Sequence, residues 1–314
     1  MALFDRISKL VIGQGGSSGL EIVNLRMAFE IHKTLGKNPN RSEIRVWNLK
    51  QSTREELEKP NTRCVLYAGY SEQDGAIKIF EGNVTYAWTS FENAEVVTQF
   101  DLGEGIQAYR DTTVTLSYPS GIGTRRVLED IAQRMGLGLD ISPDAQMRQW
   151  ASGRSFHGSA RGALDRVTRA SGLSWSIQGG TLQVIQAGGA TSRRAVVIAA
   201  DSGMIGSPER ERKGSSQTAR VRNEDTGRNV RVNSASREWS GWRVKSLLMP
   251  FIVPGDPVKM EGRSANGVFI AREVNHRGDN MEGDWQTELL LVDSQTNTRL
   301  TQTERGTTGQ RRSR

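Results

Sequence analysis

Residues 275 to 285, NHRGDNMEGDW, concentrate side chains that could do chemistry, because one histidine, two aspartates and one glutamate fall within eleven residues. Imidazole and carboxylate groups bind metal ions and act as general acids and bases. A zinc site would need further histidine or cysteine ligands, and the rest of the chain offers only His32, His157 and Cys64, on separate segments. A calcium loop needs alternating oxygen ligands and a late bidentate glutamate, a spacing that this segment lacks.

The flanks of this segment favour a different explanation. GVFIAREV before it and WQTELLLVD after it both have the pattern of strands, and Trp285, Thr287 and Leu289 alternate onto one face of the second. Strands joined by a short polar segment form a hairpin, in which Asp, Asn and Gly bond the local backbone as turn formers. The segment is therefore predicted to be a hairpin tip, with no catalytic and no metal-binding residues.

The remaining sequence holds no motif that would make the chain an enzyme. The glycine-rich GQGGSSG near the start lacks a preceding strand and the GK[ST] ending of a phosphate-binding loop. A nucleophile elbow, GxSxG in a strand–turn–helix unit, is not found either. We therefore expect no enzymatic activity and no cofactor.

The charge of the chain is unevenly spread. The 314 residues are 36% hydrophobic and 25% charged, enough apolar material for two or three domains, and the net charge is +7. Residues 294–314 carry five arginines and one glutamate, and residues 209–245 carry ten basic and five acidic residues, so the remainder sums to −2. This segregation argues against a generally cationic nucleic-acid-binding fold.

Neither a membrane span nor a secretion signal is evident in the sequence. No apolar run approaches the roughly 20 residues that cross a bilayer, and the start lacks a long apolar region with a cleavage site. The single cysteine, Cys64, cannot form an internal disulfide, and its apolar neighbours suggest a buried strand. We expect synthesis in a reducing cytoplasm and no membrane insertion of the chain itself.

Short alternating segments dominate residues 20–120, after an expected N-terminal arm at residues 1–19. In LEIVNLRMAFEIHKT, Met27, Phe29 and Ile31 alternate with polar residues, as in a half-buried strand. Similar segments bounded by Gly, Asp or Asn recur at regular spacing, with one brief helix between them. Residues 20–120 are therefore predicted to form a first β-barrel.

Helical spacing replaces this alternation between residues 121 and 190. TRRVLEDIAQRMGL and SARGALDRVTRASGL each place apolar residues on one face, and Ser159 and Gly172 are the expected ends of the second helix. LSWSIQGGTLQVIQ alternates on both sides of Gly179–Gly180, which suits a two-residue hairpin turn. These residues are predicted to form a small α+β module.

Strand patterns return in residues 191–293, which are predicted to form a second β-barrel. A charged insertion, residues 209–245, interrupts it. The last residues, 294–314, are rich in Thr, Gln and Arg, lack periodicity, and are predicted to be a disordered basic tail. The fold class expected for the whole chain is thus mainly β, with a small helix–hairpin module between two β domains.

The insertion also contains the candidate interface residues. REWSGWRV places Trp239 and Trp242 three residues apart, with Arg237 and Arg243 beside them. Aromatic and arginine side chains are the usual anchors of protein interfaces. The alternative, that both tryptophans pack onto their own domain, has equal weight at this point.

Several phrases resemble a known family. RMAFEIHKTLGKNPNRSEIRVWNL and IKIFEGNVTYA near the start, and VKSLLMPFIVPGDPVKMEG and NGVFIAREVNHRGDNMEGDWQTELLLV near the end, are similar to bacteriophage tail hub proteins. The likeness covers most of residues 20–293 and rests on strand order and short phrases. Domains of type VI secretion spikes share this architecture. Residues 209–245 are longer than the loop that the family has at this position.

The resemblance implies a structural virion protein, the hub of the tail baseplate, made in the bacterial host cytoplasm. It implies two tail-tube-like barrels per chain and a homotrimer, so that six barrels form a pseudo-sixfold ring between a hexameric tail tube and a trimeric spike. Implied partners are the tail tube or a distal tail protein, the central spike, other baseplate proteins and the tape-measure protein. Genomic DNA would pass transiently through the lumen.

Two other functions stay open at this stage. One is a tail-associated protein that binds or hydrolyses the cell wall, although no supported pair of acids is visible. The other is a nucleic-acid-binding protein, which the predicted pI of about 9.7 favours and the charge segregation opposes. The hub interpretation predicts two similar, separate β domains, and a single sheet running through both is expected to contradict it.

Overall fold

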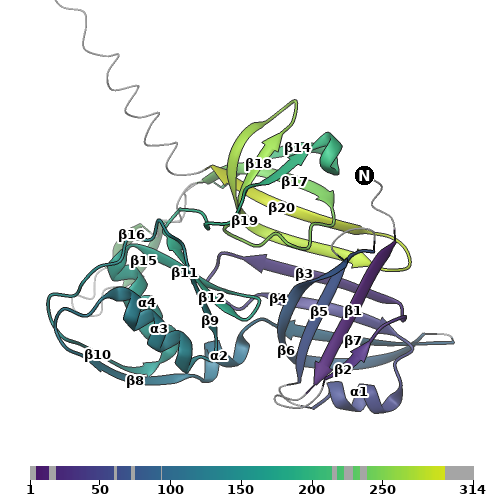
Figure 1. Ribbon diagram of the computed structural model, residues 1–314, viewed down its shortest axis with the longest axis horizontal. Coiled ribbons are helices and arrows are strands. Elements are labelled where there is room, and N and C mark those ends of the chain that lie inside the picture. Colours follow the sequence, from purple (N-terminus) through teal and green to yellow (C-terminus); the bar gives the residue numbers. More distant parts are fainter. Residues whose placement is uncertain are drawn as a thin grey trace, which may run out of the picture.

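The computed structural model describes residues 5–13, 19–59, 62–71, 75–92, 94–213, 218–222, 229–233 and 239–293. Figure 1 shows two β domains, the first at the lower right and the second at the top, with a helix-containing module at the lower left. No helix in the described part of the chain is long and apolar enough to cross a membrane.

The first β domain is built from alternating sequence. Met27, Phe29 and Ile31 are buried along one strand, while Glu30 and His32, which alternate with them, are exposed, as the sequence predicts. Its elements are β1 (Arg6–Gly13), β2 (Leu20–Ile22), β3 (Met27–Thr34), β4 (Arg41–Trp47), α1 (Gln51–Leu57), β5 (Arg63–Tyr70), β6 (Gly75–Glu92) and β7 (Glu95–Gly103).

The N-terminal residues correct one prediction. Arg6–Gly13 form β1, which pairs antiparallel with β5 along its whole length, and the side chains of Leu10 and Ile12 are completely buried. This part of residues 1–19 is therefore a core strand and not an arm. The expectation failed because the apolar alternation is short and runs directly into GQGGSSG, whose residues 14–18 lie outside the described residues.

The α+β module has the predicted helices and hairpin. Ser159 caps the second helix by accepting a hydrogen bond from the Gly162 amide at 3.2 Å, and Gly172 ends it with a φ of 68°. The module's elements are α2 (Ile106–Asp111), β8 (Thr113–Tyr118), α3 (Thr124–Arg134), β9 (Gly138–Ile141), β10 (Arg154–Ser159), α4 (Ala160–Ser171), β11 (Leu173–Gln178) and β12 (Thr181–Gln186). It begins before the predicted boundary at residue 121, because β8 pairs with β10.

The second β domain includes both ends of the predicted insertion. Residues 209–213 and 239–245 belong to two paired strands of the domain, β14 and β17, so residues 209–245 are not a loop throughout. The elements are β13 (Val196–Ala199), the short 3-10 helix η1 (Ala200–Ser202), β14 (Met204–Lys213), β15 (Thr218–Arg222), β16 (Asn229–Asn233), β17 (Trp239–Leu247), β18 (Pro257–Glu261), β19 (Asn266–Asp279) and β20 (Trp285–Asp293). Strands β15 and β16 pair with each other.

The two β domains share one sheet. As far as the chain is described, thirteen strands are joined in the order β14-β17-β20-β19-β3-β4-β7-β6-β5-β1-β2, with β18 and β13 attached beside β19. The link is β3, whose residues 28–34 pair antiparallel with residues 273–279 of β19. The expectation that the two β domains have separate sheets is therefore wrong, since within the described residues the sheet passes from one domain to the other and no closed barrel is found.

The two β domains nevertheless have the same strand order. The first runs β3-β4-β7-β6-β5-β1, and the second runs β14-β17-β20-β19-β18-β13. The pairing of β6 with β7 shifts register between Val84 and Tyr86, and that of β19 with β20 shifts between Ala271 and Glu273, at matching positions. The prediction of two similar domains is confirmed in strand order, which the repeated alternating segments specify.

Candidate functional site: the junction between the β domains

The segment NHRGDNMEGDW, residues 275–285, forms the tip of the β19–β20 hairpin. The Asp279 carboxylate accepts hydrogen bonds from the backbone amides of Met281 and Glu282 at 2.9 and 3.2 Å, the local bonds that a turn aspartate makes. It also accepts two bonds from the Arg26 guanidinium, at 2.9 and 3.2 Å. The carboxylate oxygens are therefore occupied by the turn and by the neighbouring domain.

Asn280 fastens the same tip to the first β domain. Its side-chain oxygen accepts a hydrogen bond from the Met27 amide, and its side-chain nitrogen donates to the carbonyl of Leu25, both at 2.9 Å. Both bonds go to the backbone at the start of β3, and they resemble the bonds that a neighbouring strand would make there. The tip therefore holds the two domains together.

His276 lies in the core below the tip. Its side chain is completely buried, with Nδ1 2.9 Å from the hydroxyl of Thr287. Burial and the nearby cation of Lys33 lower the pKa of His276 to about 3, so the ring is neutral. Among the described residues no group of three or more His, Cys, Asp or Glu side chains could hold a metal ion.

Trp285, at the end of the tip, packs into the core of the first domain. Its ring meets Phe29 edge-on at 5.4 Å and Tyr70 at 6.4 Å between centroids, and only 4% of its surface is exposed. Leu248 joins the same core, and its amide donates to the Tyr70 hydroxyl at 3.2 Å. The second domain thus supplies core residues to the first.

A buried polar cluster fixes the module to the first β domain. Glu104, completely buried after β7, accepts hydrogen bonds from the Asn40 side chain at 2.6 Å and from the Gly179 amide at the β11–β12 turn at 2.5 Å. The ammonium group of Lys33 lies 3.9 Å from the same carboxylate, and burial lowers the pKa of Lys33. Gln178 completes the cluster by donating to the carbonyl of Thr34 at 2.8 Å. Sequence reasoning missed this cluster, because its members are far apart in the chain.

The face of the shared sheet opposite the cores is polar and largely charge-paired. Asp101, Glu43, Glu30 and Arg277 lie directly opposite one another on β7, β4, β3 and β19. The Arg277 guanidinium is 2.7 Å from Glu30, and that of Arg45 is 3.2 Å from Glu43. Because like charges opposite one another destabilise a sheet, these arginines stabilise the acidic row.

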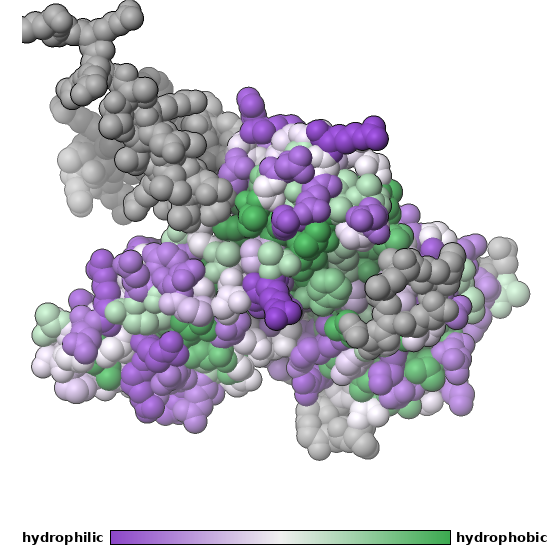
Figure 2. Space-filling view, turned by 45° about the horizontal axis from the view of Figure 1, so that its top comes forward, coloured by the Kyte–Doolittle hydropathy of each residue, from purple (hydrophilic) through white to green (hydrophobic). Residues whose placement is uncertain are grey.

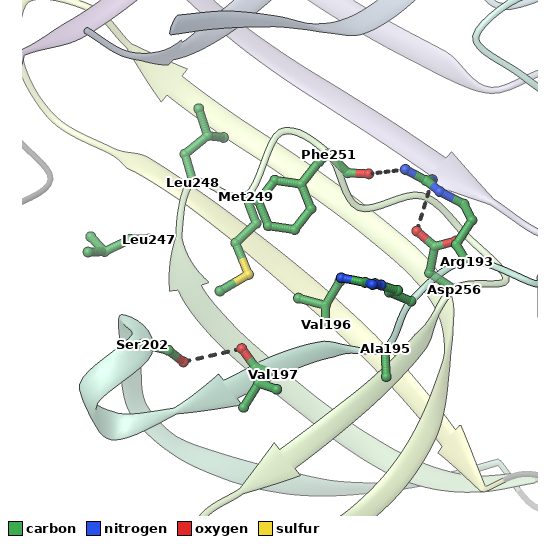
Figure 3. Close-up of a pocket in the computed structure, with 11 residues that line it drawn as sticks. Arg193, Ala195, Val196, Val197, Ser202, Leu247, Leu248, Met249, Phe251 and Asp256 are labelled. Carbon is green, nitrogen blue, oxygen red and sulfur yellow. Dashed lines mark hydrogen bonds and ion pairs between the residues drawn. The ribbon is translucent and has the colours of Figure 1, made fainter. Parts of the chain in front are cut away.

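A groove of about 480 Å³ opens beside β13. Figure 3 shows Val197, Met249 and Phe251 at this groove, with Arg193 bound to the Asp256 carboxylate and to the Phe251 carbonyl, both at 3.0 Å. Figure 2 shows hydrophobic surface gathered towards the upper centre of that view. The groove offers apolar contact beside an ion pair.

The predicted interface residues lie on β17 and just before it. Trp242 is half-buried against the second domain's core, and the guanidinium of Arg210 lies 5.0 Å from its ring centroid. Arg243 is 2.7 Å from each of two carboxylates of its own domain, Glu211 and Glu288. The backbone of Trp239 begins β17, and Arg237 lies outside the described residues. An interface role for these residues stays a prediction.

The fold is shared with solved phage and secretion proteins. The 43 kDa tail protein of prophage MuSo2 from Shewanella oneidensis has a TM-score of 0.61 and 9% identity, covering 91% of this chain and 96% of its own. The tail protein from Neisseria meningitidis MC58 has a TM-score of 0.60 and 11% identity, with the same coverage. The Escherichia coli c3393 protein, a type VI secretion component, has a TM-score of 0.54 and 10% identity, covering 90% and 76%.

The sequence itself gives the family. No curated protein sequence matches the chain. The model of the family described as baseplate hub gp41 matches residues 13–234, which include most of the first β domain, the whole module and the second β domain up to β16. A sheet running through both β domains is therefore compatible with a hub, contrary to the expectation from sequence. The chain belongs to the baseplate hub gp41 family and is a structural protein of the bacteriophage tail baseplate.

Proposed function

We propose that three copies of this chain form a ring, the hub that joins the tail tube to the central spike. The observation that carries this proposal is the identical strand order of the two β domains. Two similar domains per chain give six similar units in a closed trimer. Such a ring presents near-sixfold symmetry to a hexameric tube and true threefold symmetry to a trimeric spike.

The polar face of the sheet supports a role as the wall of a channel. Three of its arginines are paired with carboxylates: Arg277 with Glu30, Arg45 with Glu43, and Arg243 with both Glu211 and Glu288. A surface that binds DNA needs unpaired cations that can replace counterions at the phosphates. A charge-paired wall would let genomic DNA pass with little friction.

The proposal includes the partners and the absence of catalysis. The tail tube or a distal tail protein would contact one side of the ring, and the spike and other baseplate proteins the other, with the tape-measure protein and DNA inside. The chain would be made in the host bacterial cytoplasm and act without enzymatic activity. The burial and pairing of the histidine and carboxylates in NHRGDNMEGDW support this reading.

The test is the mass and symmetry of the purified full-length chain and of hubs isolated from assembled tails. We expect a trimer by native mass spectrometry and six lobes around a central hole in class averages by electron microscopy. A monomer in both preparations, or a ring with one lobe per chain, would contradict the proposal. Glu30→Lys combined with Glu43→Lys should increase retention on immobilised DNA, whereas Glu58→Lys on exposed helix surface should not.

A further inference from the structure

The groove beside β13 exposes apolar surface of the second β domain. Figure 3 shows Val196 and Val197 on one side of it and Met249 and Phe251 on the other. The side chains of Val197 and Phe251 are 44% and 43% exposed, although both are large and apolar. Apolar side chains gathered around a hollow are typical of a surface that another segment covers.

The matching strand of the first β domain has a neighbour where β13 has none described. Strands β1 and β13 are the last strands of the two matching orders. Strand β1 is flanked by β2, in which Ile22 lies opposite Leu10 and is only 6% exposed. Within the described residues, β13 pairs with β18 alone. An extended segment along β13 would therefore complete the second domain as β2 completes the first.

The start of β1 lies close to one wall of this groove. Arg6 pairs with Tyr70 of β5, and the carbonyl of Asp5 accepts a hydrogen bond from the Ser71 amide at 3.1 Å. The Tyr70 hydroxyl in turn accepts a bond at 3.2 Å from the amide of Leu248, which lines the groove. A single tyrosine side chain thus connects the start of β1 with the groove.

The residues that precede Asp5 have the chemistry of an occupant for this groove. Residues 1–4, MALF, carry no charged side chain and include a methionine, a leucine and a phenylalanine. Of the segments outside the described residues, this is the one with more than one large apolar side chain, since residues 294–314 contain only Leu300. Four extended residues reach about 13 Å, enough to enter the groove from its near wall.

We propose that residues 1–4 lie extended in the groove of their own chain, beside β13, with Leu3 and Phe4 packed against Val197 and Phe251. Main-chain hydrogen bonds to β13 would add a strand to the sheet, as in other strand additions. The burial of two large apolar side chains supplies the driving force. This contact lies within one chain and does not depend on the proposed ring.

The docked segment would be a further tie between the two β domains. It is continuous with β1, a core strand of the first domain, and it would lie on the second domain. The pair of Arg193 with Asp256, at 3.0 Å, already neutralises the charges that line the groove there. Uncharged side chains can therefore cover this pair without leaving a single charge buried.

Amide hydrogen exchange of the full-length chain tests this docking. In Leu3→Ser/Phe4→Ser, which removes both apolar anchors, we expect exchange at residues 196–199 to become on the order of tenfold faster. Phe4→Leu keeps an apolar side chain and should retain native exchange there. Native exchange in the double variant would overturn the proposal.

Leu300→Ser is the matched control, because it removes the one large apolar side chain of residues 294–314. It should leave exchange at residues 196–199 unchanged. Faster exchange in Leu300→Ser, with native exchange in the double variant, would assign the groove to residues 294–314 and overturn the proposal. Native far-ultraviolet dichroism of each variant shows that the substitutions preserve the fold.

Disulfide trapping identifies the occupant directly. The native Cys64 is completely buried and burial raises the pKa of its thiol, so it does not compete. The variant Leu3→Cys/Val197→Cys is oxidised with glutathione disulfide at low protein concentration. We expect a bond within one chain, seen as a monomer that has lost two thiols.

The control for trapping is Leu3→Cys/Val268→Cys, because Val268 is also an exposed valine of the second domain, at 49%, and does not line the groove. The bond to position 197 should form on the order of tenfold faster than the bond to position 268. Equal rates would overturn the proposal. Cross-linked dimers in place of the internal bond would also overturn it, because a second copy would then fill the groove.

Discussion

The two β domains share a strand order but cover their cores in different ways. In the first, β1 pairs with eight residues of β5 and is itself covered by β2, and α1 adds the buried side chain of Leu57. In the second, β13 pairs with four residues of β18, and the groove lies beside it. The first domain, although better covered by its own strands, also takes Trp285 and Leu248 from the second. The hairpin tip is thus a core element of the other domain, and the two domains are expected to unfold together.

The largest expected effect is that of Trp285→Ala. This substitution removes the ring that packs against Phe29 and Tyr70 and leaves a cavity in the first domain's core. We expect the free energy of unfolding to fall by about 3–5 kcal/mol, measured by urea denaturation. Amide hydrogen exchange should show the loss of stability in both β domains at once.

Trp242→Ala is the matched control for this substitution. Trp242 is only partly buried, and it packs against the second domain's own core. Removing this ring should lower the free energy of unfolding by less than Trp285→Ala does. It should leave amide hydrogen exchange in the first domain nearly unchanged. Independent unfolding of the two domains in the Trp285 variant, with the first domain unaffected, would refute the idea of a shared core.

The attachment of the module gives a smaller expected effect. Glu104→Gln keeps the shape of the side chain but presents an amide nitrogen towards Asn40 or Gly179, which both donate hydrogen bonds to the carboxylate. It also removes the negative charge nearest to the buried Lys33. We expect a loss of about 1–3 kcal/mol, with faster exchange at the β11–β12 turn.

Glu58→Gln provides the comparison for the Glu104 variant, because Glu58 is exposed at the end of α1. It should change stability by a few tenths of a kcal/mol at most. If Glu104→Gln were as mild as Glu58→Gln, the module would be held by its apolar contacts alone. Exchange at Gly179 would then match that of the unchanged chain.

Local pattern was enough to predict much of this fold. The alternation in LEIVNLRMAFEIHKT placed Met27, Phe29 and Ile31 in a core, and Gly179–Gly180 marked a turn whose φ values are 57° and 81°. The hairpin at residues 275–285 also followed from its flanks and its turn formers. These features depend on neighbours within a few residues, where the chemistry of turns and the period of a strand are decisive.

The missing parts are those set by contacts between distant segments. Nothing near Glu104 in the sequence indicates that its carboxylate meets Lys33 and the turn at Gly179. The pairing of β3 with β19 joins residues that are more than two hundred positions apart, so nothing in the local pattern of either strand identifies its partner. For the same reason, the alternation of Trp285 with Thr287 and Leu289 predicted a shared strand face but could not assign the tryptophan ring to the other domain's core.

The buried histidine makes the junction sensitive to acid. The pKa of His276 is about 3 in the folded chain and near its ordinary value of 6.5 when unfolded, so the unfolded chain binds the extra proton between these values. Stability should therefore fall as the pH drops below 6.5. Between pH 7 and pH 5 we expect this group to lower the free energy of unfolding by about 1–2 kcal/mol.

Two substitutions assign this pH dependence. His276→Gln removes the titrating group, so the difference in stability between pH 7 and pH 5 should shrink, even if the variant is less stable at both. His157→Gln, at an exposed position in the module, should leave the difference unchanged. Equal pH profiles for the native chain and His276→Gln, measured by urea denaturation at several pH values, would show that another group is responsible.

The smallest expected effect is that of Asp279→Ala, at the turn that holds the two domains together. The substitution removes the acceptor for two turn amides and one partner of Arg26, whose other partner, Glu282, remains 2.5 Å away. Because Arg26 keeps an ion pair and Asn280 keeps its two bonds to the first domain, we expect a loss of about 0.5–2 kcal/mol and intact assembly. Met281→Ala, at a side chain that is 67% exposed, should be neutral by the same urea measurement. A loss as large as that of Trp285→Ala would mean that the turn, and not the buried ring, holds the junction together.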